Sequence, residues 1–151
     1  MRRFVVTVLL LAGLFPVAVA VAVAAQSPGE AAARDAVDRF GRALTSGNVS
    51  SLGALLPQKG KVQLKLVRMG PEQGAFSASQ VEALLRDFLA QGSVQTFKTL
   101  RVEHDPHGVA IASSRLDLKD KQGRPASVEL HLVFQPEGER WVVREIRETP
   151  R

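Results

Sequence analysis

Apolar and polar residues alternate most regularly around residue 130. Every second position there is apolar, at Val128, Leu130, Leu132 and Phe134. Because successive side chains of a β-strand point to opposite faces, this period of two predicts a strand with one face on a hydrophobic core. Similar segments precede and follow it, so we expect residues 93–149 to be a run of β-strands.

Two turns between these strands share the pattern Asp-x-x-Gly, beginning at Asp105 and Asp120. The pattern suits a type I turn followed by a glycine in the left-handed region, which closes a hairpin. The first turn would therefore pair Asp105 with Val109, and the second would pair Asp120 with Arg124.

The third connection spans residues 136–139, and its simplest register sets Gln135 against Arg140. Together the three registers collect one apolar face: Leu100, Val102, Ala110, Ala112, Leu116, Leu118, Val128, Leu130, Leu132, Phe134, Trp141 and Val143. A four-stranded antiparallel meander with one buried side is predicted, since a one-residue slip would scatter this set over both faces. Phe97 is out of phase, which indicates either a β-bulge near residues 97–99 or an error in the register.

Two earlier stretches have the spacing of amphipathic helices. The first carries the apolar stripe Ala33, Ala36, Val37, Phe40, Ala43 and Leu44. The second begins with a Ser-x-x-Gln capping box at Ser77 and is stopped by Gly92. Between them we expect a short helix, capped by Ser50 or Ser51, and a half-exposed strand at residues 61–67.

The beginning of the chain has the pattern of a targeting segment. Two arginines precede a charge-free run at residues 4–25 that ends in small residues. This predicts a signal peptide over residues 1–25, a linker over 26–30 and a single domain over 31–149. The run could also span a bilayer, so an uncleaved anchor is the alternative. Both place the domain outside the cytoplasm, periplasmic or secreted, and only an uncleaved segment would bring it into contact with the membrane.

The composition excludes several classes of function. The chain has no cysteine, so disulfides, thiolate chemistry and lipidated cysteines are excluded. Its net charge of +5 comes from scattered basic residues, with no Tyr and a single Trp, and we expect no nucleic-acid partner. His104 and His107 flank a turn without a third ligand nearby, so we predict neither a metal nor a cofactor.

The order of the elements resembles the nuclear transport factor 2-like superfamily, the cystatin-like α+β cone shared by ketosteroid isomerases and polyketide-cyclase-like proteins. The resemblance rests on the opening helix ending at residues 40–48, the leucines at 52, 55 and 56, and the closing strand at 141–146. It covers residues 30–149 and is greatest for small secreted bacterial-type members of unassigned function.

This resemblance implies an α+β fold around a cone-shaped cavity. Its curved antiparallel sheet would consist of the four-stranded C-terminal meander plus one or two earlier strands. The sheet would wrap on N-terminal helices and one central amphipathic helix. No settled activity follows from this fold.

Few polar groups lie on the predicted inner face. The registers place Ser114 and Glu145 on either side of Leu130, with Arg147 next along and Trp141 on the same face. We expect these five residues to contact a ligand, because small side chains on the neighbouring strand leave room in the cone. The alternative is an open rim at which the charged pair is solvated.

The favoured function is an exported, non-catalytic module that binds a small apolar or amphipathic ligand or another protein. The alternative is an isomerase, dehydratase or hydrolase-type enzyme using Glu145 with Ser114 or His104. The tyrosine and aspartate pair that the resemblance would imply for an isomerase is missing, because the chain has no Tyr.

The predicted outer face carries a contiguous apolar patch: Val109, Ile111, Val133, Val142 and Ile146. Contiguous exposed apolar area usually marks an interface, so we expect a homodimer with an isologous contact through this face. The alternatives are that the N-terminal segment covers the patch, or that the patch is too small to matter.

Overall fold

The computed structural model describes residues 28–69 and 73–149, so the predicted signal peptide lies outside the described residues. The elements in order are α1 (Pro28–Thr45), the 3₁₀-helix η1 (Val49–Leu55), β1 (Val62–Lys65), β2 (Gln73–Phe76), α2 (Ala78–Ala90), β3 (Gly92–His104), β4 (Ala110–Asp120), β5 (Pro125–Glu137) and β6 (Arg140–Thr149). The predicted α+β class is confirmed. Within the described ranges, no helix is long and apolar enough to cross a membrane.

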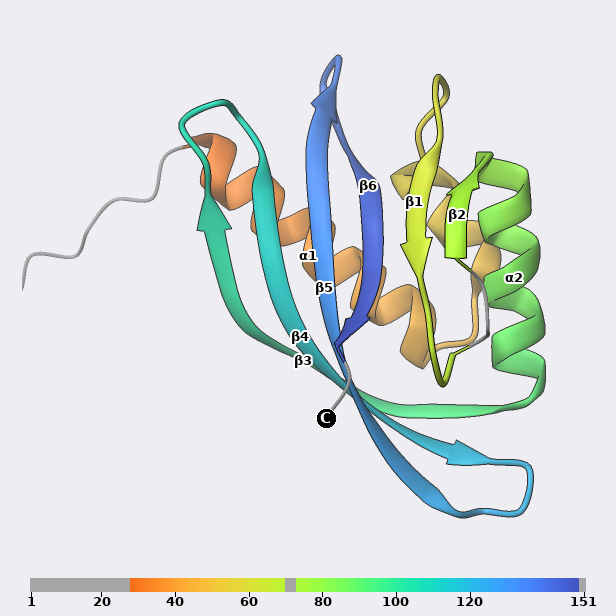
Figure 1. The fold of residues 1–151 in the computed structure, drawn as a ribbon. Helices are drawn as coiled ribbons and strands as arrows, with labels where there is room; N and C mark the ends of the chain where they lie inside the picture. The colour runs from red at the N-terminus through yellow and green to blue at the C-terminus, as the bar shows by residue number, and fades with distance from the viewer. Residues whose placement is uncertain (1–27, 70–72, 150–151) are drawn as a thin grey trace, which may run out of the picture.

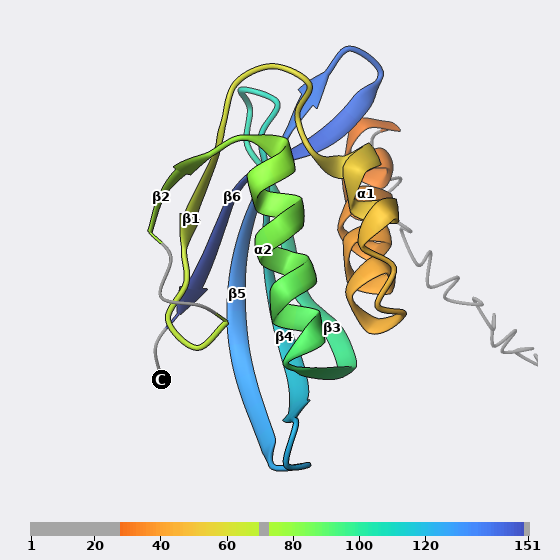
Figure 2. The same cartoon turned by 90° about the vertical axis from the view of Figure 1, so that its right-hand side faces the viewer.

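One curved sheet contains all six strands, in the order β2-β1-β6-β5-β4-β3 (Figure 1). The predicted meander forms β3 to β6, and the two earlier strands extend it beyond β6. Leu64 of β1 pairs in parallel with Ile146 of β6, so the sheet is mixed rather than purely antiparallel. Figure 2 shows α1 and α2 on the same side of this sheet.

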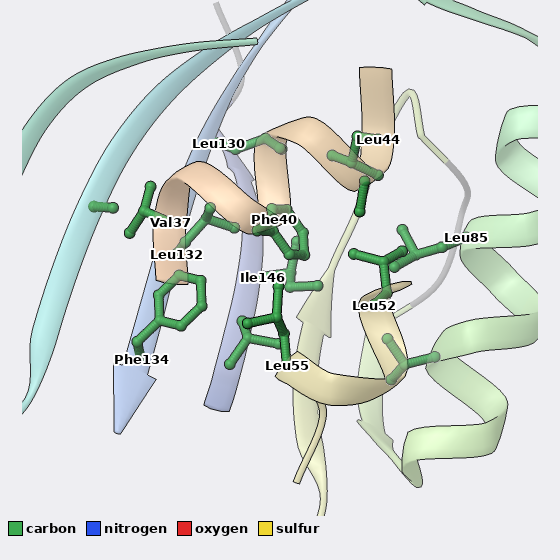
Figure 3. Packing of buried hydrophobic residues seen from close by; sticks show 14 of the residues in the cluster. Val37, Phe40, Leu44, Leu52, Leu55, Leu85, Leu130, Leu132, Phe134 and Ile146 are labelled. Atoms are coloured by element: carbon green, nitrogen blue, oxygen red, sulfur yellow. The ribbon is translucent and has the colours of Figure 1, made fainter. Parts of the chain in front are cut away.

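A single hydrophobic core joins the helices to the inner face of the sheet. The predicted stripe of α1 is fully buried, and Figure 3 shows Phe40 in the middle of this core. The Phe40 ring packs edge-on against Phe97 and against Phe134, with centroid distances of 6.2 Å in both cases. Helix α2 begins at the predicted capping box, in which Ser77 and Gln80 bond each other's backbone amides.

A β-bulge in β3 explains the phase of Phe97. The register with β4 shifts between Thr99 and Arg101, so Phe97 points inward opposite Leu116. The predicted bulge is confirmed, but the prediction that Leu100 lies on the core face is wrong, because this extra residue is 47% exposed.

The predicted register between β5 and β6 is wrong. Gln135 faces Val142 rather than Arg140, because the strands continue to a tight turn at residues 138–139. A second shift follows between Val133 and Phe134. Beyond it the predicted register is displaced by an odd number of residues, which exchanges the two faces of β6.

Candidate functional site

The register shift moves the predicted catalytic carboxylate out of the cone. Glu145 lies opposite Val133 on the outer face, and its Oε1 is 3.2 Å from Nε of Arg147. The predictions that Glu145 and Arg147 line the inner face are therefore wrong. Ser114 and Leu130 do lie on the inner face and are buried.

Glu148 occupies the inner position opposite Leu130 that we predicted for Glu145. Its side chain is buried, and its Oε2 accepts hydrogen bonds from the amides of Val67 (2.7 Å), Arg68 (2.6 Å) and Met69 (3.1 Å). The carboxylate thus fastens the segment that follows β1 to the end of β6. Sequence reasoning missed it, because the bulge in β6 leaves no trace in the apolar period.

The remaining predicted residues do not converge on one site. His104 is exposed and its ring meets that of Trp141 edge-on at 5.5 Å, beside Gly29 in the first turn of α1. Ser114 lies further along β4, and its Oγ is buried without a partner among the described residues. The small residue Ala112 is a fully buried member of the hydrophobic core.

A pocket of about 400 Å³ lies instead at the other end of the sheet, and we call it the α2–hairpin pocket. It is formed by the C-terminal end of α2, the start of β3, the β4–β5 hairpin and one residue after β1. Its apolar lining consists of Phe88, Leu89, Val94, Leu118, Pro125 and Ala126. Its charged lining consists of Arg68, Lys119, Asp120 and Arg124.

Glycine at position 92 brings the two walls of the α2–hairpin pocket together. A Cβ at Gly92 would overlap the carbonyl oxygen of Lys119, so β3 can start against β4 only without a side chain there. Phe88 and Leu89, in the last turn of α2, stay only partly buried beside this junction. The β4–β5 hairpin extends past the C-terminal end of α2 (Figure 1), and residues of both elements line the pocket.

The charges at the rim do not all compensate one another. Asp120 accepts hydrogen bonds from the amides of Arg124 and Gln122, both at 2.9 Å, and its Oδ2 is 2.6 Å from Arg124 Nε. The amide of Arg124, followed by these other contacts, holds the pKa of Asp120 below its ordinary value of 3.8. Arg68 and Lys119 form no ion pair with a described residue, so the rim has a positive excess.

A charge network ties the loop after η1 to the β5–β6 hairpin. The Glu137 carboxylate accepts hydrogen bonds from the amides of Gln58 (2.9 Å) and Lys59 (3.3 Å) and from the guanidinium groups of Arg140 (2.9 Å) and Arg144 (3.3 Å). The bond from Gln58 is the largest of the contributions that lower the pKa of Glu137 from its ordinary value of 4.5.

The outer apolar patch is smaller than predicted. Val133 faces Glu145 rather than Val142, and Ile146 is fully buried on the inner face. Val142 is also fully buried. It lies two residues after Arg140, which forms an ion pair with Glu137. Three members of the predicted patch stay partly exposed: Val109, which directly precedes β4, and the cross-strand neighbours Ile111 and Val133.

Within the described ranges, no group of three or more His, Asp or Glu side chains could hold a metal ion. Sequence reasoning also missed every residue of the α2–hairpin pocket. The available signal was the apolar end of the α2 stripe at Phe88 and Leu89, followed directly by Gly92. That signal marks the helix end but not the hairpin that overhangs it.

Several solved structures share this fold at low sequence identity. A DUF4783 family protein from Bacteroides fragilis YCH46 is 14% identical, with a TM-score of 0.56 over 73% of this chain and 93% of that one. An M. tuberculosis LEH-like epoxide hydrolase is 17% identical, with a TM-score of 0.61 over 82% and 81%.

A Catenulispora acidiphila protein with a ketosteroid isomerase-like fold, in complex with trimethylamine, is 13% identical, with a TM-score of 0.60 over 77% and 85% of the two chains. These likenesses confirm the nuclear transport factor 2-like fold. A comparison with curated proteins finds no match. The model of the family described as "Domain of unknown function (DUF4783)" matches residues 37–148, and the chain belongs to this family.

Proposed function

We propose that this domain binds a small apolar or amphipathic molecule in the α2–hairpin pocket and does so without catalysis. The observation that carries the proposal is the pocket itself, whose volume of about 400 Å³ and largely apolar walls suit a small ligand. An apolar chain would lie against Phe88, Leu118 and Ala126, where its burial replaces contact between these side chains and water.

The geometry favours binding over the enzymatic alternative. Glu145 lies on the outer face, whereas Ser114 lies on the inner face and His104 packs against Trp141 at the end of β3, and this separation counts against a shared substrate. Asp120 lines the pocket, but its lowered pKa makes it a weak base. The epoxide hydrolase and the protein with the isomerase-like fold therefore support the fold of this domain, but they do not identify a catalytic base in it.

Calorimetric titration with octanol tests the proposal. We expect saturable binding, and we expect Ala126→Phe to abolish it, because a ring at this partly buried position would fill the pocket. Ala83→Phe is the matched control, since Ala83 is exposed on α2 and does not line the pocket. Absence of both heat and thermal stabilisation across a series of alkanols would refute the proposal.

We also propose that the domain acts outside the cytoplasm. The support is the charge-free run at residues 4–25, which follows two arginines and ends in small residues. Fusing residues 1–30 to alkaline phosphatase, which is active only after export, should give activity in a bacterial host. An inactive fusion, with the reporter retained in the cytoplasm, would contradict this part of the proposal.

A further inference from the structure

Glu148 fixes the backbone from which Arg68 projects. Three successive amides, at residues 67–69, donate to the single oxygen Oε2 of Glu148. Three bonds to one charged acceptor restrain this short segment strongly, because hydrogen bonds to ionised groups are shorter and stronger than neutral ones. The Met69 side chain is also buried, so the segment is held through its backbone and through one side chain.

Arg68 lines the α2–hairpin pocket, although its backbone belongs to the segment after β1. Its side chain forms no ion pair with a described residue, and the same is true of Lys119 on the hairpin wall. Asp120, the acidic group of the pocket, is already paired with Arg124. The pocket therefore has an apolar interior and two uncompensated cationic side chains, a combination complementary to an amphipathic anion.

We infer that Glu148 is a positioning residue that holds Arg68 at the rim and thereby makes the α2–hairpin pocket prefer carboxylate-bearing amphiphiles over neutral ones. This inference rests on the proposed function. The buried carboxylate never touches the ligand. Its effect is transmitted through the amides of residues 67–69, which set the direction of the Arg68 side chain.

Head-group preference separates this role from general structural support. Loss of a buried support weakens binding of every ligand alike, whereas misplacement of Arg68 weakens only the anionic one. The measured quantity is the ratio of the octanol Kd to the octanoate Kd, determined by calorimetry. Because Arg68 is exposed, we expect a ratio of about two- to fivefold for the unmodified protein, as for a surface ion pair.

Four variants test the inference. Arg68→Gln and Glu148→Ala should each lower the ratio clearly, to the part that Lys119 alone provides, while octanol binding persists. Glu148→Gln, which keeps one acceptor oxygen, should restore part of the preference for the carboxylate. It also replaces the alanine variant if that variant does not fold. Glu145→Gln is the matched control, since this carboxylate lies on the outer face of the same strand, and it should leave the ratio unchanged.

Amide hydrogen exchange measured by NMR provides a readout that needs no ligand. In Glu148→Ala and Glu148→Gln, the amides of residues 67–69 should exchange faster, while those of β1 keep their protection. A head-group ratio that survives Glu148→Ala in a folded protein would overturn the inference and leave the proposed function intact. Failure of the unmodified protein to bind either probe would refute the proposed function and the inference with it.

Discussion

The part of the sheet under α1 and the end that carries the α2–hairpin pocket are built from the same strands but packed differently. Under α1, Phe40 packs edge-on against Phe97 and Phe134, and in this continuous core Phe40 and Phe134 are fully buried while Phe97 is partly buried. At the pocket, Phe88 and Leu89 remain partly exposed beside a hollow of about 400 Å³. The comparison indicates that stability is concentrated in the first region and that the second can be changed at a smaller cost.

Truncating one phenylalanine in each region should give the largest contrast. Phe40→Ala removes a fully buried ring, and we expect it to lower the free energy of unfolding by about 3–5 kcal/mol. Phe88→Ala should cost less, because its ring is already partly solvated, yet it should weaken octanol binding. Urea denaturation and calorimetry measure the two effects. Equal losses of stability would contradict the proposed division between the two regions.

A methyl group added beside Phe97 should have the next largest effect. A Cβ at Gly41 of α1 would overlap the Phe97 ring, so Gly41→Ala should destabilise the domain by about 1–3 kcal/mol through overpacking. Gly53→Ala is the matched control, because nothing lies within 4 Å of its added Cβ. Urea denaturation should show Gly53→Ala to be nearly neutral, and an equal loss in both variants would show that tight packing at Phe97 is not the cause.

The Glu137 network should contribute a smaller, pH-dependent stabilisation. Because the folded-state pKa of Glu137 lies below its ordinary value of 4.5, the contribution is present above that value and is lost as the pH falls through the folded-state pKa. Glu137→Gln should therefore lower the Tm at neutral pH, and the difference should narrow in acid. Glu139→Gln, at an exposed neighbouring position, is the control. A difference that does not vary with pH would refute this account.

Most of the sheet under α1 could be predicted from the sequence because local signals fix it. The turns at Asp105 and Asp120 have the predicted hydrogen bonds to Val109 and Arg124, and these bonds determine which residues of β3, β4 and β5 face inward. The predicted register of the last strand was wrong for equally local reasons. Gly138, with a φ of 64°, closes a tighter turn than its neighbours indicate, and a bulge then reverses the face of β6.

The candidate site could not be predicted in this way, because its parts meet only through tertiary structure. The α2–hairpin pocket depends on how far the β4–β5 hairpin extends beyond α2, which no periodicity records. Glu148 became visible only after the bulge in β6 was known, and its partners at residues 67–69 come from a distant segment. Alternation predicts which side chains are buried, but not which polar groups meet there.

The smallest effect we expect concerns association through the outer face. We still propose a homodimer, now carried by the reduced patch Val109, Ile111 and Val133, of which Ile111 and Val133 are direct cross-strand neighbours. A stable interface buries about 800 Å² on each partner, more than three partly exposed side chains provide, so surrounding polar residues must contribute and the dimer should be weak.

Sedimentation velocity at micromolar concentration measures this association. Val133→Glu should shift the domain to monomer without unfolding it, since repulsion would arise where the patch meets its copy. Val67→Glu is the matched control, because Val67 is 56% exposed and lies outside the patch. Val133 is on the sheet face opposite the core, so octanol binding should be the same in monomer and dimer. A monomeric unmodified domain would show that the register shift, by moving Ile146 to the inner face and Val142 away from Val133, also removed the basis for the dimer.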